Sequence, residues 1–70
     1  MRRQRVTSSS LCSVGYDARS RTLEIEFHSG AVYQYLDVPR AVFEELLAQD
    51  SLGAYFNMEI RDVYPCVRVQ

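Results

Sequence analysis

The sequence predicts an α+β fold, with a three-stranded antiparallel meander, then two helices, and a short edge strand at the C-terminal end. Apolar and polar residues alternate with a period of two over residues 22–36, which is typical of half-buried strands. Apolar residues recur at helical spacing over residues 42–47 and again over residues 52–60. Seventy residues suffice for one domain. We place that domain at residues 10–70, after a flexible basic tail at residues 1–9.

The first strand is predicted over residues 10–16, where Cys12, Val14 and Tyr16 share one face. Gly15 would weaken the interior of a strand, so we expect a bulge or a close approach of another backbone segment there. Residues 17–20 have the composition of a turn, because an aspartate can hydrogen-bond the backbone just after it. The strand therefore runs into a turn that leads to the next strand.

The loop of the following hairpin decides where the rings of Tyr33 and Tyr35 point. A two-residue loop, Ser29-Gly30, would place both rings on the same face as the strand's glutamates, in water. A three-residue loop over residues 28–30, with glycine in the left-handed conformation, shifts the pairing by one residue. We favour this second register, because it separates apolar from polar side chains better. It pairs Leu23 with Tyr35, Glu24 with Gln34, Ile25 with Tyr33, and Glu26 with Val32.

Pro39 is predicted to begin the first helix, because the N–H that proline lacks would be unpaired at that position. Ser51 is predicted to cap the second helix. Gly53 in its first turn is costly for a helix, so we expect it to permit close packing. The extended C-terminal segment, residues 64–69, contains Pro65 and is therefore confined to an edge, which we place beside the first strand. The predicted apolar faces consist of Val42, Phe43, Leu46 and Leu47 in the first helix, and Leu52, Tyr55, Phe56 and Ile60 in the second.

The charge is unevenly distributed, although the chain as a whole carries only −1. Residues 1–22 hold five arginines and one acid, a net charge of +4, and residues 23–70 have a net charge of −5. The chain has no lysine, and the forked guanidinium of arginine suits phosphate contacts. The first third of the chain is therefore a candidate for binding a polyanion.

No pattern in the sequence indicates catalysis, a cofactor or a metal ion. Glu24 and Glu26 lie about 7 Å apart on one strand face, a spacing seen in paired catalytic carboxylates, but we interpret them as part of a solvated sheet face. Cys12 and Cys66 are expected to be reduced thiols, and two cysteines with one histidine are too few for a zinc site. No apolar run approaches the roughly 18 residues of a membrane span, so we expect a cytoplasmic protein. Because no catalytic pattern is found, we also expect that the protein is not an enzyme.

Several segments together resemble the KTSC domain, which occurs at the C-terminus of some lysyl-tRNA synthetases and in small stand-alone bacterial proteins. The resemblance covers nearly the whole chain after the tail, and its mark is a central Tyr-x-Tyr, here Tyr33 and Tyr35. It implies the α+β fold and, through its association with the synthetases, RNA binding. The resemblance rests on residues 13–17, residues 23–27, Gly30, residues 33–35, residues 37–39, residues 51–53, residues 55–57, Ile60 and Tyr64.

Two functions therefore compete. In the first, the domain is a monomer that binds RNA, because bases stack on aromatic rings and arginines pair with phosphates. In the second, it is a protein-interaction module that adds a partner strand to its sheet edge. Val32 and Leu36 would then be apolar contacts on the outer face of the sheet. The predicted RNA contacts are Arg2, Arg3, Arg5, Arg19, Arg21, Arg61, Tyr33 and Tyr35.

Overall fold

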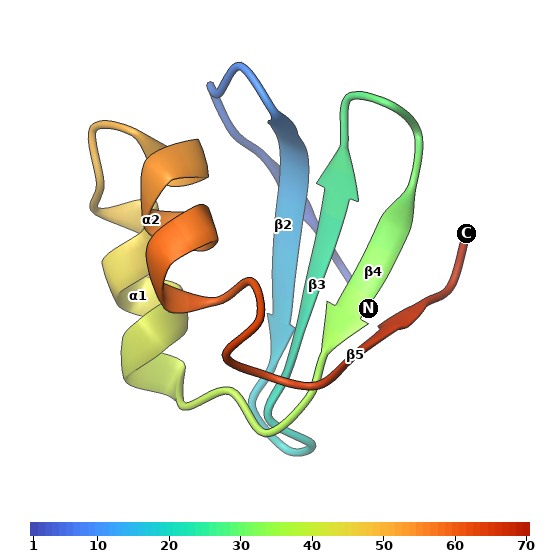
Figure 1. The fold of residues 1–70 in the computed structure, drawn as a ribbon. Coiled ribbons are helices and arrows are strands. Elements are labelled where there is room, and N and C mark those ends of the chain that lie inside the picture. Colours follow the sequence, from blue (N-terminus) through green and yellow to red (C-terminus); the bar gives the residue numbers. More distant parts are fainter.

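The computed structural model describes residues 1–70 as a five-stranded sheet with two helices packed on one side (Figure 1). Neighbouring strands are all antiparallel, and their order across the sheet, β1-β2-β3-β4-β5, follows the order along the chain. The α+β class and the two helices are confirmed. The elements are β1 (Gln4–Arg5), β2 (Leu11–Asp17), β3 (Thr22–Phe27), β4 (Val32–Tyr35), α1 (Arg40–Leu47), α2 (Leu52–Glu59) and β5 (Cys66–Arg68).

The predicted three-stranded meander is wrong in its number of strands, since four strands precede the helices. The additional strand, β1, lies in the segment that we expected to be a flexible tail, and it pairs Gln4 with Val14 and Arg5 with Ser13. Val6 packs against the core just beyond it. A strand of two exposed residues has no period-two pattern, so the sequence of this segment does not predict it.

The favoured hairpin register is confirmed. Tyr35 lies opposite Leu23, and Tyr33 lies opposite Ile25. The backbone N–H of Phe27 donates to the carbonyl oxygen of Ala31 at 2.9 Å, which closes a three-residue loop. Gly30 in that loop has φ +95°, a conformation that glycine adopts without strain. The loop therefore directs both tyrosine rings to the helix side of the sheet.

β2 has a bulge, but it lies between Leu11 and Ser13 rather than at Gly15. The bulge shifts the alternation, so that Leu11 points into the core in place of Cys12, while Val14 and Tyr16 share the core face as predicted. At Gly15 the alternative expectation holds, because a Cβ atom there would collide with the carbonyl oxygen of Arg2. Glycine at this position lets the N-terminal segment lie directly against the sheet.

The helix boundaries follow the capping residues. Pro39 is the N-cap of α1, so the helix begins one residue later than predicted. The Ser51 side chain caps α2 by accepting a hydrogen bond from the backbone N–H of Ala54 at 3.2 Å, as predicted. A Cβ atom on Gly53 would lie 2.7 Å from the Oγ of Ser10, so this glycine does permit close packing. The core consists of Leu11, Val14, Leu23, Ile25, Tyr35, Val38, Leu46, Leu52, Phe56 and Ile60.

The C-terminal segment forms an edge strand, as predicted, but beside β4 and not beside β2. β1 already occupies the free edge of β2, which leaves β4 as the available edge. The prediction that Val32 is an exposed apolar contact is wrong, because Val32 is only 2% exposed. The C-terminal segment pairs with it: the N–H of Val32 donates to the carbonyl oxygen of Gln70 at 2.9 Å, and the carbonyl oxygen of Val32 accepts from the N–H of Val69 at 2.8 Å. Neither helix is long and apolar enough to cross a membrane.

Candidate functional site

The structure brings three of the predicted site residues, Tyr33, Tyr35 and Arg61, to one open groove. The groove lies between the β4–β5 edge of the sheet and the C-terminal end of α2, and it has a volume of about 780 Å³. Such a volume is within the range of about 300–1,000 Å³ that is usual for small-molecule sites. The residues that line it are Ser10, Phe27, Ser29, Ala31, Tyr33, Tyr35, Phe56, Asn57, Arg61, Asp62, Cys66 and Arg68.

Four aromatic rings form the apolar part of the groove. The rings of Phe27 and Tyr33 meet edge to face with centroids 6.0 Å apart, and those of Tyr35 and Phe56 meet in the same way at 5.5 Å. The two tyrosine rings lie 6.4 Å apart and are tilted by 30°. Edge-to-face pairs are favourable because the positive edge of one ring meets the negative face of the other. The rings that line the groove therefore pack against and stabilise one another.

Tyr35 combines a buried ring with an unpaired hydroxyl. The residue is only 5% exposed, yet its hydroxyl forms no hydrogen bond within the chain. Burial raises the pKa of Tyr35 to about 12, so that the hydroxyl keeps its proton at neutral pH. By contrast, the hydroxyl of Tyr16 donates to the carbonyl oxygen of Val38. Tyr35 thus presents an unused donor at the groove.

Two arginines line the polar part of the groove, and neither forms an ion pair. The guanidinium carbon of Arg68 lies 6.0 Å from the centre of the Tyr33 ring, at the outer limit of a cation–π contact. Arg61 follows α2 and contacts the Oδ1 of Asn57 at 3.4 Å. Asp62 supplies the one negative charge among the lining residues. The groove therefore has an excess of positive charge beside its rings.

The other predicted arginines do not line the groove. Arg2 and Arg5 lie in the N-terminal segment, and Arg19 and Arg21 lie in the turn between β2 and β3. These four side chains are exposed and form no ion pair. Arg3 is different, because it is bound within the fold. The sequence-level group of arginines is thus divided among separate parts of the surface.

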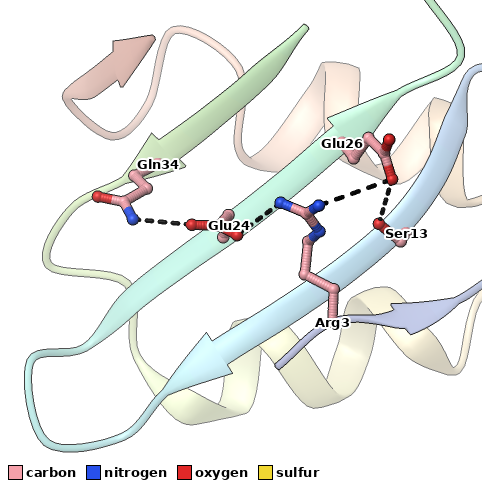
Figure 2. Close-up of polar contacts among 5 residues, drawn as sticks. All are labelled: Arg3, Ser13, Glu24, Glu26 and Gln34. Atoms are coloured by element: carbon pink, nitrogen blue, oxygen red, sulfur yellow. Dashed lines mark hydrogen bonds and ion pairs between the residues drawn. The ribbon is translucent and has the colours of Figure 1, made fainter. Parts of the chain in front are cut away.

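Arg3 belongs to a polar network on the sheet face away from the helices (Figure 2). Its guanidinium donates to the carboxylate of Glu24 at 2.7 Å, and the same carboxylate accepts from the side chain of Gln34 at 2.8 Å. Ser13 donates to Glu26 at 2.8 Å, while Arg3 lies 3.9 Å from that second carboxylate. The Glu24 side chain is only 10% exposed, so the predicted solvated face is wrong at this position. We call these five residues, Arg3, Ser13, Glu24, Glu26 and Gln34, the outer-face network.

The hydrogen bond from Ser13 has a measurable consequence for Glu26. That bond, with the nearby charge of Arg3, lowers the pKa of Glu26 below its usual value of 4.5, although partial burial opposes the shift. Glu26 is therefore ionised at neutral pH. The partners of Glu26, Ser13 and Arg3, do not line the groove.

Sequence analysis missed Arg68 and Cys66 as groove residues. Both face the groove because β5 pairs Arg68 with Tyr33 and Cys66 with Tyr35. The alternation in the C-terminal segment would have identified them if the segment had been placed beside β4. Cys12 and Cys66 are free thiols, and no three His, Cys, Asp or Glu side chains are grouped so that they could hold a metal ion.

Comparison with known proteins agrees with this architecture. The family model described as the KTSC domain matches residues 7–64. A crystal structure of a KTSC domain protein from Yersinia pestis superimposes with a TM-score of 0.96 at 36% sequence identity, and the match covers 99% of this chain and 97% of that one.

The sequence relatives include short proteins of similar length and a short segment within much longer proteins. An uncharacterized protein of Stutzerimonas stutzeri is 53% identical over 57 residues, which cover 81% of this chain and 80% of the relative. A lysine–tRNA ligase of Nostoc punctiforme is 46% identical over 46 residues, which cover 66% of this chain but only 8% of the ligase. The family model and the structural match confirm the resemblance found in the sequence, and the chain belongs to the KTSC domain family.

Proposed function

We propose that this chain is a non-enzymatic binding domain that takes single-stranded RNA into the groove. The observation that carries the proposal is that the partly exposed ring of Tyr33 and two arginines without ion-pair partners line the same open groove. Bases stack on aromatic rings with about 1–3 kcal/mol per base, and guanidinium groups pair with phosphates. The groove thus combines the two kinds of contact that single-stranded RNA needs.

The similarity to lysine–tRNA ligases supports RNA as the partner. A segment similar to this chain occurs within enzymes whose name includes tRNA, although it makes up only 8% of their length. Since the segment is short, it does not bring the activity of those enzymes to this chain. It supports a binding role for the domain beside RNA.

The exposed arginines outside the groove have a secondary role in this proposal. Arg2, Arg5, Arg19 and Arg21 attract phosphate at longer range, and Arg3 contributes little because it already pairs with Glu24. An interaction of this kind weakens steeply as salt rises, because binding releases the counterions of the RNA. We therefore expect the affinity for RNA to fall with salt.

The proposal is tested by fluorescence anisotropy with a labelled, unstructured oligouridine at low and high salt. Arg68→Gln and Arg61→Gln should each weaken binding about tenfold, because each removes a phosphate contact worth about 1.4 kcal/mol. The matched control is Arg40→Gln, which removes the same charge from an exposed position on α1. Equal affinities for the groove variants and the control would overturn the groove as the RNA site.

A second candidate function rests on the exposed edge of the sheet. All residues of β5 are exposed, and Val67 in this strand and Val69 just after it are 50% and 48% exposed. A partner strand could add to this edge through backbone hydrogen bonds. Light scattering over a range of concentrations, together with capture of a protein partner after nuclease treatment, distinguishes the two functions. A nuclease-insensitive partner that Val67→Asp releases would favour the interaction module.

A further inference from the structure

The hydroxyl of Tyr35 belongs to a largely buried residue but has no hydrogen-bond partner within the chain. Every fully buried side-chain nitrogen or oxygen atom has a hydrogen-bond partner, and the Tyr35 hydroxyl has none. The residue as a whole is nevertheless 95% buried, since it is only 5% exposed. The hydroxyl therefore belongs to the small part of Tyr35 that reaches the surface, and that surface is the groove.

The surroundings of the hydroxyl place it in the groove as well. The charged and titratable groups that act on the Tyr35 phenol are those of Cys66, Tyr33, Arg61 and Asp62. All four residues line the groove. The ring of Tyr35 contacts Phe56 in the core, and Tyr35 lines the groove together with these four residues. The side chain thus extends from the core to the binding surface.

We infer that the groove is a site for one phosphorylated nucleotide, in which the Tyr35 hydroxyl hydrogen-bonds the base while Arg61 and Arg68 hold the phosphate. This inference rests on the proposed function. It goes further by naming the unit that is bound and the residue that determines specificity. The same chemistry occurs in a free nucleotide and in one nucleotide of an RNA chain, and the experiment below separates these sources.

The depth of the groove residues supports this orientation. Tyr35 is buried, whereas Arg61 and Arg68 are exposed. A base is flat and largely apolar, so it fits against the partly exposed rings of Phe27 and Tyr33, and the phosphate stays at the hydrated rim beside the guanidinium groups. The raised pKa of Tyr35 keeps the hydroxyl protonated, so it can donate to a ring nitrogen or carbonyl of the base.

A hydroxyl that is open to water in the free groove and is covered by the bound base is suited to discriminate between bases. A site that hydrogen-bonds its ligand rejects analogues that lack the matching group, because the covered hydroxyl loses its water and is then left unpaired. Bases differ in the acceptors and donors at their edges. The four nucleotides are therefore expected to bind with different affinities, and that difference depends on the Tyr35 hydroxyl.

The test compares the wild-type protein with Tyr35→Phe, which removes only the hydroxyl and keeps the ring. The probes are the four nucleoside 5′-monophosphates, ribose 5-phosphate as the ligand without a base, and an oligouridine. We expect at least one monophosphate to bind more tightly than ribose 5-phosphate. Tyr35→Phe should weaken that ligand about tenfold and reduce the difference between bases, with an unchanged melting temperature. Tyr55→Phe is the matched control, because Tyr55 does not line the groove.

Each outcome decides between the proposals. If Tyr35→Phe binds every probe as the wild type does, the role of Tyr35 is overturned while RNA binding in the groove stands. If the oligouridine binds, the monophosphates do not, and Tyr35→Phe weakens the oligouridine, the bound unit is a nucleotide within RNA and the role of Tyr35 stands. If the wild-type protein binds none of the probes, both proposals fall.

Discussion

The two faces of the sheet use polar side chains in opposite ways. On the outer face, the Arg3 guanidinium donates to the Glu24 carboxylate at 2.7 Å, and the Gln34 side chain donates to the other oxygen of that carboxylate (Figure 2). On the groove face, the Tyr35 hydroxyl has no partner within the chain, and the Arg68 guanidinium pairs with no side-chain carboxylate and donates only to the main-chain oxygen of Gln70 at 3.2 Å. The difference teaches that a charged or polar residue is available to a ligand only where the fold has not already satisfied it.

The largest effect is expected from Tyr35→Ala, which tests whether the groove face is also part of the core. Removing a ring that contacts Phe56 and lies opposite Leu23 should lower the free energy of unfolding by about 3 kcal/mol or more. Tyr35→Phe should change it very little, because the hydroxyl has no partner to lose. Denaturant unfolding of both variants measures the difference. Similar losses for both variants would contradict the unpaired hydroxyl.

Glu24→Ala tests the outer-face network and should cost about 2 kcal/mol of stability, because it removes two hydrogen bonds to a charged group. The affinity for RNA should stay the same, since Glu24 does not line the groove. Glu44→Ala is the control, because its 3.7 Å pair with Arg40 is exposed on both sides and such pairs contribute about 0.5 kcal/mol or less. If Glu24→Ala were as mild as the control, the network would not be a structural element.

Gly15→Ala tests how the N-terminal segment is attached to the sheet. The new Cβ atom would collide with the carbonyl oxygen of Arg2, so the segment must shift and β1 should separate from β2. We expect a loss of about 1 kcal/mol, the lower end of the cost of overpacking, because a terminal segment can move. Hydrogen exchange should become faster in β1 and stay unchanged in the β3–β4 hairpin. Unchanged exchange in β1 would contradict the close approach at Gly15.

The smallest effect concerns the acid stability that Glu26 supplies. Its pKa is lowered in the folded protein, first by the hydrogen bond from Ser13, so the unfolded chain binds the proton more tightly. The contribution is therefore present above the usual pKa of 4.5 and is lost as pH falls through the lower folded value. Ser13→Ala should move the pKa of Glu26 upward in an NMR titration. The pKa of Asp17, which is lowered mainly by the backbone N–H of Arg19, is the internal control and should not move.

Local pattern predicted the hairpin, both helices and the Ser51 cap, because each depends on neighbouring residues or on a short loop. It did not predict β1, since the strand forms through contacts of Arg3 and Val6 that are distant in sequence. The position of β5 was wrong for the same reason, because the free sheet edge is decided by where β1 lies.

The candidate site was predictable only in part. Tyr33, Tyr35 and Arg61 were named from the sequence, and they meet in the groove. Arg68 was missed because its position opposite Tyr33 follows from the pairing of β5 with β4. The role of Arg3 could not be read from its charge, because the carboxylate that binds it lies 21 residues away in the sequence.

The most direct test of the account is an NMR titration of the isotope-labelled protein with single-stranded RNA at low and high salt. We predict salt-sensitive shifts at Tyr33, Tyr35, Arg61 and Arg68, with the signals of the outer-face network unchanged. Shifts confined to the outer-face network, or no shifts at low salt, would contradict the claim that the groove is the binding face.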